Sequence, residues 1–190
     1  VKAKAIIDKA SAKIQSSSLK VEFTLLVEDL KTKQSESVKG DLFMKGSKFK
    51  LKLSDMETFF DGKTQWVYMP GNKEVSIANP DEEELQEINP TLVLSGYSKT
   101  GIIQFAADNK TNSPNYSVDI YPENKKKSFF KINVVLNKQT MELVSIKIFG
   151  RNAVNTTLQV NKYQQGVNIE EAMFVFDVKK YPGITVNDLR

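Results

Sequence analysis

Serine, lysine and carboxylate side chains are the groups that could do chemistry here, because the chain of 190 residues contains no histidine and no cysteine. Without histidine it lacks the usual general base and the commonest metal ligand. Without cysteine it has no disulfide and no thiolate ligand for a metal. We therefore expect no catalytic residue, no metal site and no cofactor.

Two short motifs are typical of serine β-lactamases. Ser47 and Lys50 have the S-x-x-K spacing, and residues 99–101 read Lys-Thr-Gly. S-x-x-K also begins at Ser17 and Ser128, which is close to what chance gives in a chain so rich in serine and lysine. The helical subdomain that would carry such a nucleophile is missing. The motifs therefore do not predict an enzyme.

Two further patterns also fail as catalytic or phosphate sites. Residues 96–101, GYSKTG, have the outer glycines of a phosphate loop, but Ile102 and Ile103 stand where lysine and serine or threonine must follow. The four acids at 81–84 occupy consecutive positions, which point in different directions on a helix and form no catalytic pair. They fit the exposed first turn of a helix.

The charge is mildly basic, at +4 with a pI of about 9.0. Arginine occurs only as Arg151 and Arg190, so lysine carries nearly all the positive charge. Lysine is poorly suited to bidentate hydrogen bonding with nucleic-acid bases or phosphates. We expect no nucleic-acid partner and a lysine-covered sheet face. The three consecutive lysines at residues 125–127 form either a turn that keeps a strand end soluble or a contact for phosphate head groups.

The elements that would position any site begin with an amphipathic helix over residues 1–18, in which apolar side chains recur at helical spacing. About eleven strands follow, recognised by alternating apolar and polar residues between tight turns. We expect them at 19–29, 37–46, 48–53, 56–60, 64–69, 74–78, 116–123, 129–137, 143–150, 156–164 and 172–178. Residues 80–101 interrupt this pattern with two short helices, and residues 179–190 form an extended tail.

The spacing leaves no room for crossover helices, so the fold class is mainly β with helices: one antiparallel sheet in a single domain over residues 1–190. A sheet of about eleven strands curls and encloses more space than its own side chains fill. The helices at 1–18 and 80–101 are the elements available to plug that space. The sequence therefore predicts a cavity with a helical covering.

Several stretches resemble the family of the periplasmic outer-membrane lipoprotein carrier protein LolA. They occur in the family's order: LKVEFTLLV, GDLFMKGSKFKLKL, DGKTQWVYMPGNKEVSI, NPTLVLSG and MFVFDVKKYPGITVNDLR. The resemblance covers most of the chain, and residues 105–150 match least well. D-G-K-T-x-W-x-Y-x-P is its most specific part.

The resemblance implies an unclosed, curled antiparallel β-barrel with an α-helical lid at residues 80–101. It also implies an apolar cavity that holds the acyl chains of lipoproteins. The carrier would take its cargo from an inner-membrane ABC transporter and pass it to an outer-membrane acceptor. A periplasmic location follows, with a signal peptide already removed, and no apolar run approaches the ~18 residues of a membrane span. We expect a monomer, although an exposed strand edge leaves a weak dimer open.

The sequence departs from the family at one position. In the familiar carriers an arginine follows the lysine of the GDLWVKRP segment and holds the lid closed. Gly46 occupies that position here. Lys45 or Lys48 could substitute, but lysine lacks the planar fork of arginine.

Inward-facing apolar residues on the expected strands and lid are the candidate cavity lining, since such a pocket needs shape and apolar surface rather than catalytic groups. The expected lining comprises Phe23, Leu25, Phe49, Leu51, Leu53, Trp66, Tyr68, Leu92, Leu94, Ile132, Val134, Phe174 and Phe176. A register shift of one residue on any strand would move its side chains to the other face.

Two other functions remain compatible with the same fold. One is a periplasmic sensor that reads lipid or misfolded protein and binds a signalling partner, although such sensors usually carry an additional domain. The other is a carrier of different amphiphiles, such as glycolipids or polyketide-type pigments. Identifying the bound cargo separates these alternatives from lipoprotein transport.

Overall fold

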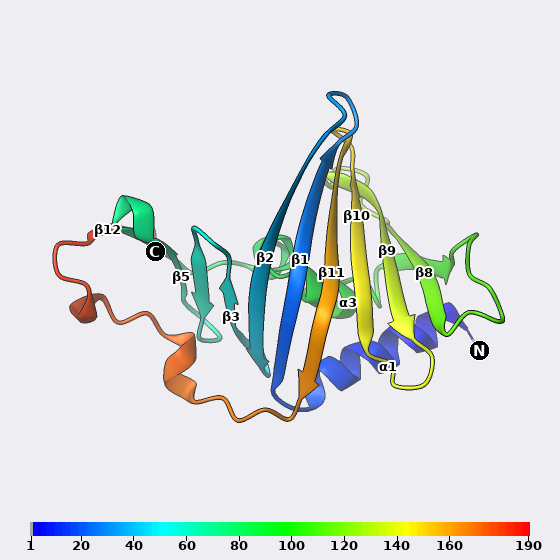
Figure 1. The fold of residues 1–190 in the computed structure, drawn as a ribbon, viewed down its shortest axis with the longest axis horizontal. Coiled ribbons are helices and arrows are strands. Elements are labelled where there is room, and N and C mark those ends of the chain that lie inside the picture. Colours follow the sequence, from blue (N-terminus) through cyan, green and yellow to red (C-terminus); the bar gives the residue numbers. More distant parts are fainter. Residues whose placement is uncertain (1) are drawn as a thin grey trace.

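A computed structural model describes residues 2–190 and consists of one twelve-stranded sheet with helices on one side (Figure 1). The strand order is β12-β6-β5-β4-β3-β2-β1-β11-β10-β9-β8-β7, so β12 and β7 form two free edges and the barrel is not closed. The strands are β1 (Leu19–Asp29), β2 (Gln34–Lys45), β3 (Lys48–Lys52), β4 (Glu57–Phe60), β5 (Gln65–Met69), β6 (Glu74–Ala78), β7 (Gly101–Phe105), β8 (Asn115–Pro122), β9 (Phe129–Asn137), β10 (Leu143–Gly150), β11 (Val154–Gln165) and β12 (Thr185–Asp188).

Three helices and four 3-10 turns complete the described chain. The helices are α1 (Ala3–Ser16), α2 (Glu82–Ile88) and α3 (Val93–Gly96). The turns are η1 (Pro70–Asn72), η2 (Pro90–Leu92), η3 (Glu171–Phe174) and η4 (Val178–Lys180). We call residues 82–96, which contain α2, η2 and α3, the lid. Residues 166–184, which contain η3 and η4, are called the C-terminal segment.

The N-terminal helix forms as its apolar spacing predicts. Its buried residues are Ala3, Ile6, Ile7, Ala10 and Ile14, all on one stripe. This stripe packs against the sheet beside α3 and β7, and Figure 1 shows α1 and α3 together on the far side of the sheet. We call the sheet face that α1 and α3 cover the helix face, and the opposite one the outer face.

The longest strands follow their alternating sequence closely. In β1 the residues Leu19, Val21 and Phe23 are buried on the helix face, and the intervening polar residues lie on the outer face. Phe23 lies opposite Gly40 of β2. A Cβ atom at Gly40 would lie 2.5 Å from the Phe23 ring, so this position requires glycine to leave room for the ring.

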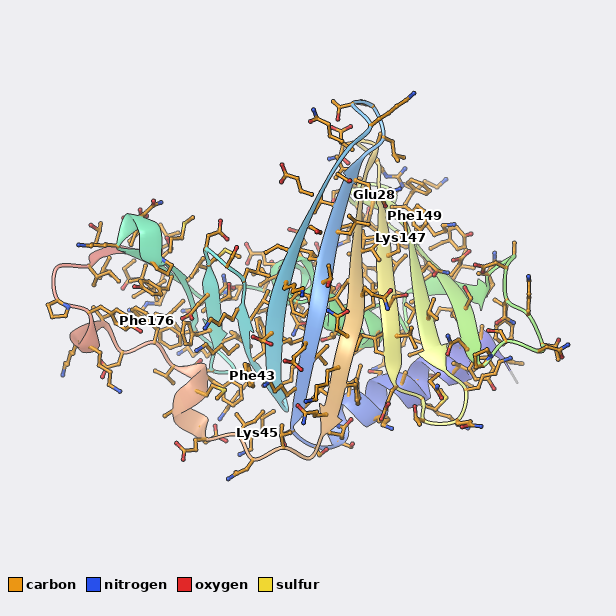
Figure 2. All side chains as sticks on the ribbon, in the orientation of Figure 1. Glu28, Phe43, Lys45, Lys147, Phe149 and Phe176 are labelled. Atoms are coloured by element: carbon orange, nitrogen blue, oxygen red, sulfur yellow. The ribbon has the colours of Figure 1, made fainter. Side chains whose placement is uncertain are left out.

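The outer face of the central strands carries charges and isolated aromatic rings, as expected for a solvated face. Lys147 of β10 pairs with Glu28 of β1 at 3.4 Å and lies 5.3 Å from the ring centre of Phe149. Figure 2 labels these three residues on the central and right-hand strands. Pairs of this kind contribute little to stability when they are solvated, so the core of these strands lies on the helix face.

Three parts of the predicted strand arrangement are corrected. Residues 101–105 form β7, an edge strand that the sequence analysis did not recognise. Residues 185–188 form β12, which pairs with β6 in parallel, whereas all other neighbouring strands are antiparallel. Residues 172–178 are not a strand but parts of η3 and η4 with extended backbone between them. Their alternating apolar pattern arises because Phe174 and Phe176 are buried while Val175 is exposed. Among the described residues, this stretch makes no strand-pairing hydrogen bonds.

Candidate functional site

Most of the predicted cavity residues meet on the helix face. They belong to one cluster of buried apolar side chains that joins the sheet, α1 and the lid. The members or packed neighbours of this cluster are Phe23, Leu25, Phe49, Leu51, Leu53, Leu92, Leu94, Ile132 and Val134. The structure therefore brings together residues that lie more than one hundred positions apart in the chain.

The strand register explains why the residues of β3 reach this face. Phe49 pairs with Met44 of β2 on one side and with Phe60 of β4 on the other. Leu51 pairs with Leu42 in the same way. Directly opposed residues share a face in an antiparallel sheet, so all five side chains point toward the helices.

The other half of the helix face is built around β9. Ile132 and Val134 are fully buried and alternate with outward-facing residues. Each is flanked in register by apolar residues of β8 and β10, which are Ile120, Val118, Ile148 and Ile146. The helix face thus continues as an apolar surface from β3 to β8.

Helix side chains fill this surface in the present conformation. Ile6 and Ile7 of α1 and Val93 and Leu94 of α3 are all buried within the same cluster. A long apolar ligand could reach the sheet only if some of these side chains moved away. The lid is the more separable of the two coverings, because it is broken into two short helices and a 3-10 turn, and its helix α2 has no buried residue.

A buried polar contact holds the lid over β2. Asn89 and Thr91, at the start of η2, are almost fully buried beside Met44. The Thr91 hydroxyl lies 2.7 Å from the Asn89 Oδ1 atom and 3.2 Å from the Met44 sulfur, and it can donate to one of them at a time. The Asn89 amide nitrogen lies 3.7 Å from the same sulfur. Sulfur is a weak acceptor, so the hydrogen bonds to Met44 are weak.

Gly46 takes no part in holding the lid. It lies in the β2–β3 turn with φ +61°, and a Cβ atom built on it would have no neighbour within 4 Å. Lys45 and Lys48, the proposed substitutes, both form ion pairs with Glu171 of the C-terminal segment instead. The side-chain contacts between β2 and the lid are therefore those of Met44 with Asn89 and Thr91.

A second contact holds the other end of the lid. Lys127, in the β8–β9 turn, places its Nζ atom 2.7 Å from Glu83 of α2. Burial lowers the pKa of Lys127, but the hydrogen bond with Glu83 and the neighbouring Tyr97 raise it by more, so the net pKa is raised. Burial also raises the pKa of Tyr97. The amine is therefore cationic at neutral pH and the phenol is uncharged.

A cavity of about 380 Å³ opens beside this contact, between the lid and the strands β9 and β10. Its floor is apolar, with Val93, Tyr97, Phe129 and Ile148, and its rim is polar. The rim residues are Glu83, Gln86, Glu87, Lys127 and Ser128. An apolar floor beneath a charged rim is an arrangement that suits an amphiphile.

Two buried polar atoms on the helix face have no hydrogen-bond partner among the described residues. They are the Thr58 Oγ1 and Gln65 Oε1 atoms. Thr58 lies opposite Leu51, and Gln65 lies opposite Phe60, so both point toward the helix side of the sheet. Buried polar groups are usually paired, and these two could accept a polar group of a ligand.

Trp66 and Tyr68 are not on the helix face, which corrects their predicted position. Trp66 pairs with Phe59, and Tyr68 pairs with Glu57. Phe59 follows the opposite alternation from Phe60, which faces the helices. The sequence offers two adjacent phenylalanines at 59–60, so either register gives a buried aromatic and alternation alone does not decide the face.

A second, smaller cluster forms around these residues on the outer face. Its buried members are Phe59, Val75 and Phe176. The Phe176 ring centre lies 4.9 Å from that of Tyr68 and 4.5 Å from that of Tyr181, with which it is stacked. Figure 2 shows Phe176 near β5, well away from α1. This cluster fixes the C-terminal segment to the sheet.

Phe174 and Phe176 were expected to line the cavity, but they do not lie on the helix face. Phe174 is fully buried in η3, a turn that contacts β3 and β4. The ion pairs of Glu171 with Lys45 and Lys48 place the same turn on the outer face, because these lysines alternate with Met44 and Phe49. The aromatic side chains of the β4–β5 hairpin thus form the surface on which the C-terminal segment packs.

A charged groove of about 580 Å³ lies along β1, β2 and β11 and reaches the apolar cluster at Phe23 and Leu53. Its lining includes Glu22, Lys39, Asp41, Lys52 and Lys162. The bulge at Asn161, where β11 carries one extra residue against β1, contributes to its wall. Its mixture of both charges shows no preference for one kind of ligand.

Among residues 2–190, no group of three or more histidine, cysteine, aspartate or glutamate side chains is placed to hold a metal ion. Within the same residues, no helix is both long and apolar enough to span a membrane. Neither strand alternation nor motif spacing pointed to Met44, Asn89, Thr91 and Tyr97. Asn89-Pro90-Thr91 carried the only available signal, since a helix start was expected there but not its burial.

Residues 2–152 match the sequence family described as outer membrane lipoprotein carrier protein LolA. No curated protein matches the chain. Among solved structures, an uncharacterized conserved protein from Thermus thermophilus is similar with a TM-score of 0.64 and 12% identity, covering 98% of both chains. The LolA superfamily protein NE2245 from Nitrosomonas europaea is similar with a TM-score of 0.51 and 10% identity, covering 94% of this chain and 99% of the other. These structures share the fold of the present chain.

Proposed function

The chain belongs to the family of the outer membrane lipoprotein carrier protein LolA, and from this premise we propose that it carries lipoproteins through the periplasm by binding their acyl chains on the helix face. The cargo would come from an inner-membrane ABC transporter and pass to an outer-membrane acceptor. The carrier would act as a monomer. Its function would be binding and release rather than catalysis.

One observation carries this proposal most directly: a continuous apolar sheet face is covered by a short helical lid that weak polar contacts hold in place. The lid contributes Leu92 and Leu94 to the cluster, and Asn89 and Thr91 fasten it to Met44. An acyl chain that displaced the lid would meet Phe49, Leu51 and their neighbours instead.

The energetics suit a carrier that needs help to release its cargo. Burying a chain of about 16 carbons at about 0.8 kcal/mol per CH₂ yields on the order of 10 kcal/mol. The closed lid already buries part of the same surface, so lid closure competes with the ligand and reduces this gain. Release then requires only the remaining difference, which an acceptor with a better site could supply.

The first experiment is native mass spectrometry of the protein purified from its own periplasm, followed by release and identification of the bound material. Acylated lipoprotein is the expected result. A free glycolipid or pigment would keep the binding face and replace the cargo. If the purified protein contained no bound material and did not bind added lipid, the carrier function would be refuted and a sensor or scaffold would be favoured.

A matched pair of variants tests the face itself. Leu51→Glu places a charge on the buried apolar face of β3 that the ligand would meet, whereas Leu189→Glu makes the same change at an exposed position near the C-terminus. We expect the first variant to lose binding of a fluorescent apolar probe and the second to retain it. Equal binding by both variants would show that the lid side of the helix face does not take up the ligand.

A further inference from the structure

The rim of the cavity beside the lid brings two opposite charge clusters together. Helix α2 begins with acids at 82–84 and carries Glu87, all on the lid. The β8–β9 turn that faces it carries three lysines at 125–127 and belongs to the sheet. Opening of the lid would therefore carry the acids away and leave the lysines at the rim of the apolar face.

The two side chains that join these clusters differ in their exposure to solvent. The side chain of Lys127 is 14% exposed, whereas that of its partner Glu83 is 68% exposed. The turn that carries Lys127 is fixed, because the Arg151 side chain donates to the Lys127 carbonyl at 3.1 Å and the Arg151 backbone donates to Ser128 at 2.8 Å. The lysine is thus a built-in part of the cavity wall, and the glutamate is a partner that the lid brings to it.

Lid opening would leave the Lys127 ammonium without a counterion next to Phe129 and Ile148. An ammonium that has lost its carboxylate beside apolar side chains gains a charge-assisted hydrogen bond from a new anionic partner. A ligand that supplied an anion at this position would provide that hydrogen bond. A ligand without one would not.

We propose that Lys127 binds the anionic head group of a long-chain amphiphile, whose apolar chain enters the helix face through the cavity between the lid and β9–β10. In the closed protein Glu83 occupies the place of that anion. The head group is a phosphate or carboxylate attached to the chain. This inference goes beyond the proposed function, because the acyl chains of a lipoprotein end in ester or amide groups rather than in an anion. It rests on that function in requiring that the helix face takes up an acyl chain.

The test compares amphiphiles that share one hexadecyl chain and differ in the head group. Hexadecyl phosphate and hexadecanoate are anionic, and hexadecyl maltoside is neutral. Affinities are measured on the full chain by displacement of N-phenylnaphthylamine fluorescence. The variants are Lys127→Met, Lys127→Arg and Glu83→Gln, with Lys126→Met and Glu82→Gln as controls at exposed positions of the same turn and helix.

We expect Lys127→Met to weaken binding of both anionic ligands about tenfold, the value of one charge-assisted hydrogen bond, and to leave hexadecyl maltoside unchanged. Lys127→Arg should restore most of this loss. Glu83→Gln should raise the ratio of anionic to neutral affinity, because it removes the competing carboxylate. The two control variants should behave as the unmodified protein.

Other outcomes separate the two proposals. If the unmodified protein bound neither the probe nor any amphiphile, the proposed function would fail together with this inference. If it bound all three ligands and Lys127→Met changed none, or weakened all equally, only the inference would be overturned. Inorganic phosphate is added as a further competitor. If it displaced the probe as well as hexadecyl phosphate did, the site would bind free phosphate and the link between chain and head group would be refuted.

Discussion

The lid covers part of the apolar helix face, and the C-terminal segment covers an apolar part of the otherwise charged outer face. The two segments are attached in different ways. The lid over the helix face is held by Asn89, Thr91 and an ion pair at its start. The C-terminal segment over the outer face is held by stacked aromatic rings around Phe176 and by the parallel pairing of β12 with β6. Both coverings are short, and both contain a 3-10 turn.

This difference indicates which covering can exchange with a ligand. A hydrogen bond contributes about 1 kcal/mol in net terms, because water or a ligand replaces the lost partner. Stacked rings bury apolar surface that water does not replace, and they are lost together with the β12–β6 pairing when the segment detaches. The lid can therefore give way to an acyl chain, while the C-terminal segment remains part of the scaffold.

The largest effect that distinguishes the two faces is expected from Phe49→Ala. Phe49 is fully buried in the main cluster and contacts strands on both sides, so its removal leaves a cavity that little can fill. We expect a loss of about 3–5 kcal/mol in the free energy of unfolding, measured by urea denaturation. Val175→Ala, at an exposed position of the C-terminal segment, is the control and should change stability by less than about 0.5 kcal/mol.

Phe176→Ala should have a smaller and more local effect. It removes the ring around which Tyr68 and Tyr181 pack, so the C-terminal segment should loosen while the helix face stays intact. We expect a loss of about 2 kcal/mol in the free energy of unfolding. Hydrogen exchange should become faster in β12 and β6. Faster exchange in β1 and β11 as well would contradict the separation of the two clusters.

Strand alternation predicted the helix face well because most of its strands have one wet side. In β1 and β3, polar and charged residues alternate with large apolar residues, so the sequence alone indicates which side of each strand is buried. The same rule failed for Trp66 and Tyr68. In β4 and β5 both faces are covered at Phe59 and Phe60, and alternation then gives no direction.

The C-terminal segment escaped prediction for a related reason. Residues 172–178 alternate like a strand, but they pack on the outer face against β3 and β4, while β12 takes the edge of β6. The contact of Asn89 and Thr91 with Met44 is a tertiary feature with no local pattern. Neither could be read from a single sequence, because both depend on which elements become neighbours.

Thr91→Val sharpens the comparison at the lid. The change removes the hydroxyl that contacts Met44 and Asn89 and keeps the shape of the side chain. We expect the closed lid to lose about 1 kcal/mol, which should raise the affinity for an apolar ligand about fivefold. Thr111→Val, at an exposed loop position, is the control. An unchanged or reduced affinity in Thr91→Val would mean that lid closure does not compete with binding.

The smallest effect is expected from the ion pairs of Glu171 with Lys48 and Lys45, which fasten the C-terminal segment at its start. Hydrogen bonds from these lysines lower the pKa of Glu171 below its ordinary value. A carboxylate with a depressed pKa stabilises the folded state above its unfolded pKa of about 4.3, and this contribution is lost as the pH falls through the lower folded value. Because these groups are exposed, Glu171→Gln should shift the urea midpoint only slightly at pH 7, and the shift should disappear in acid and in high salt. A large shift that persists in high salt would show that the C-terminal segment, like the lid, depends on a polar contact, and the contrast between the two coverings would then be lost.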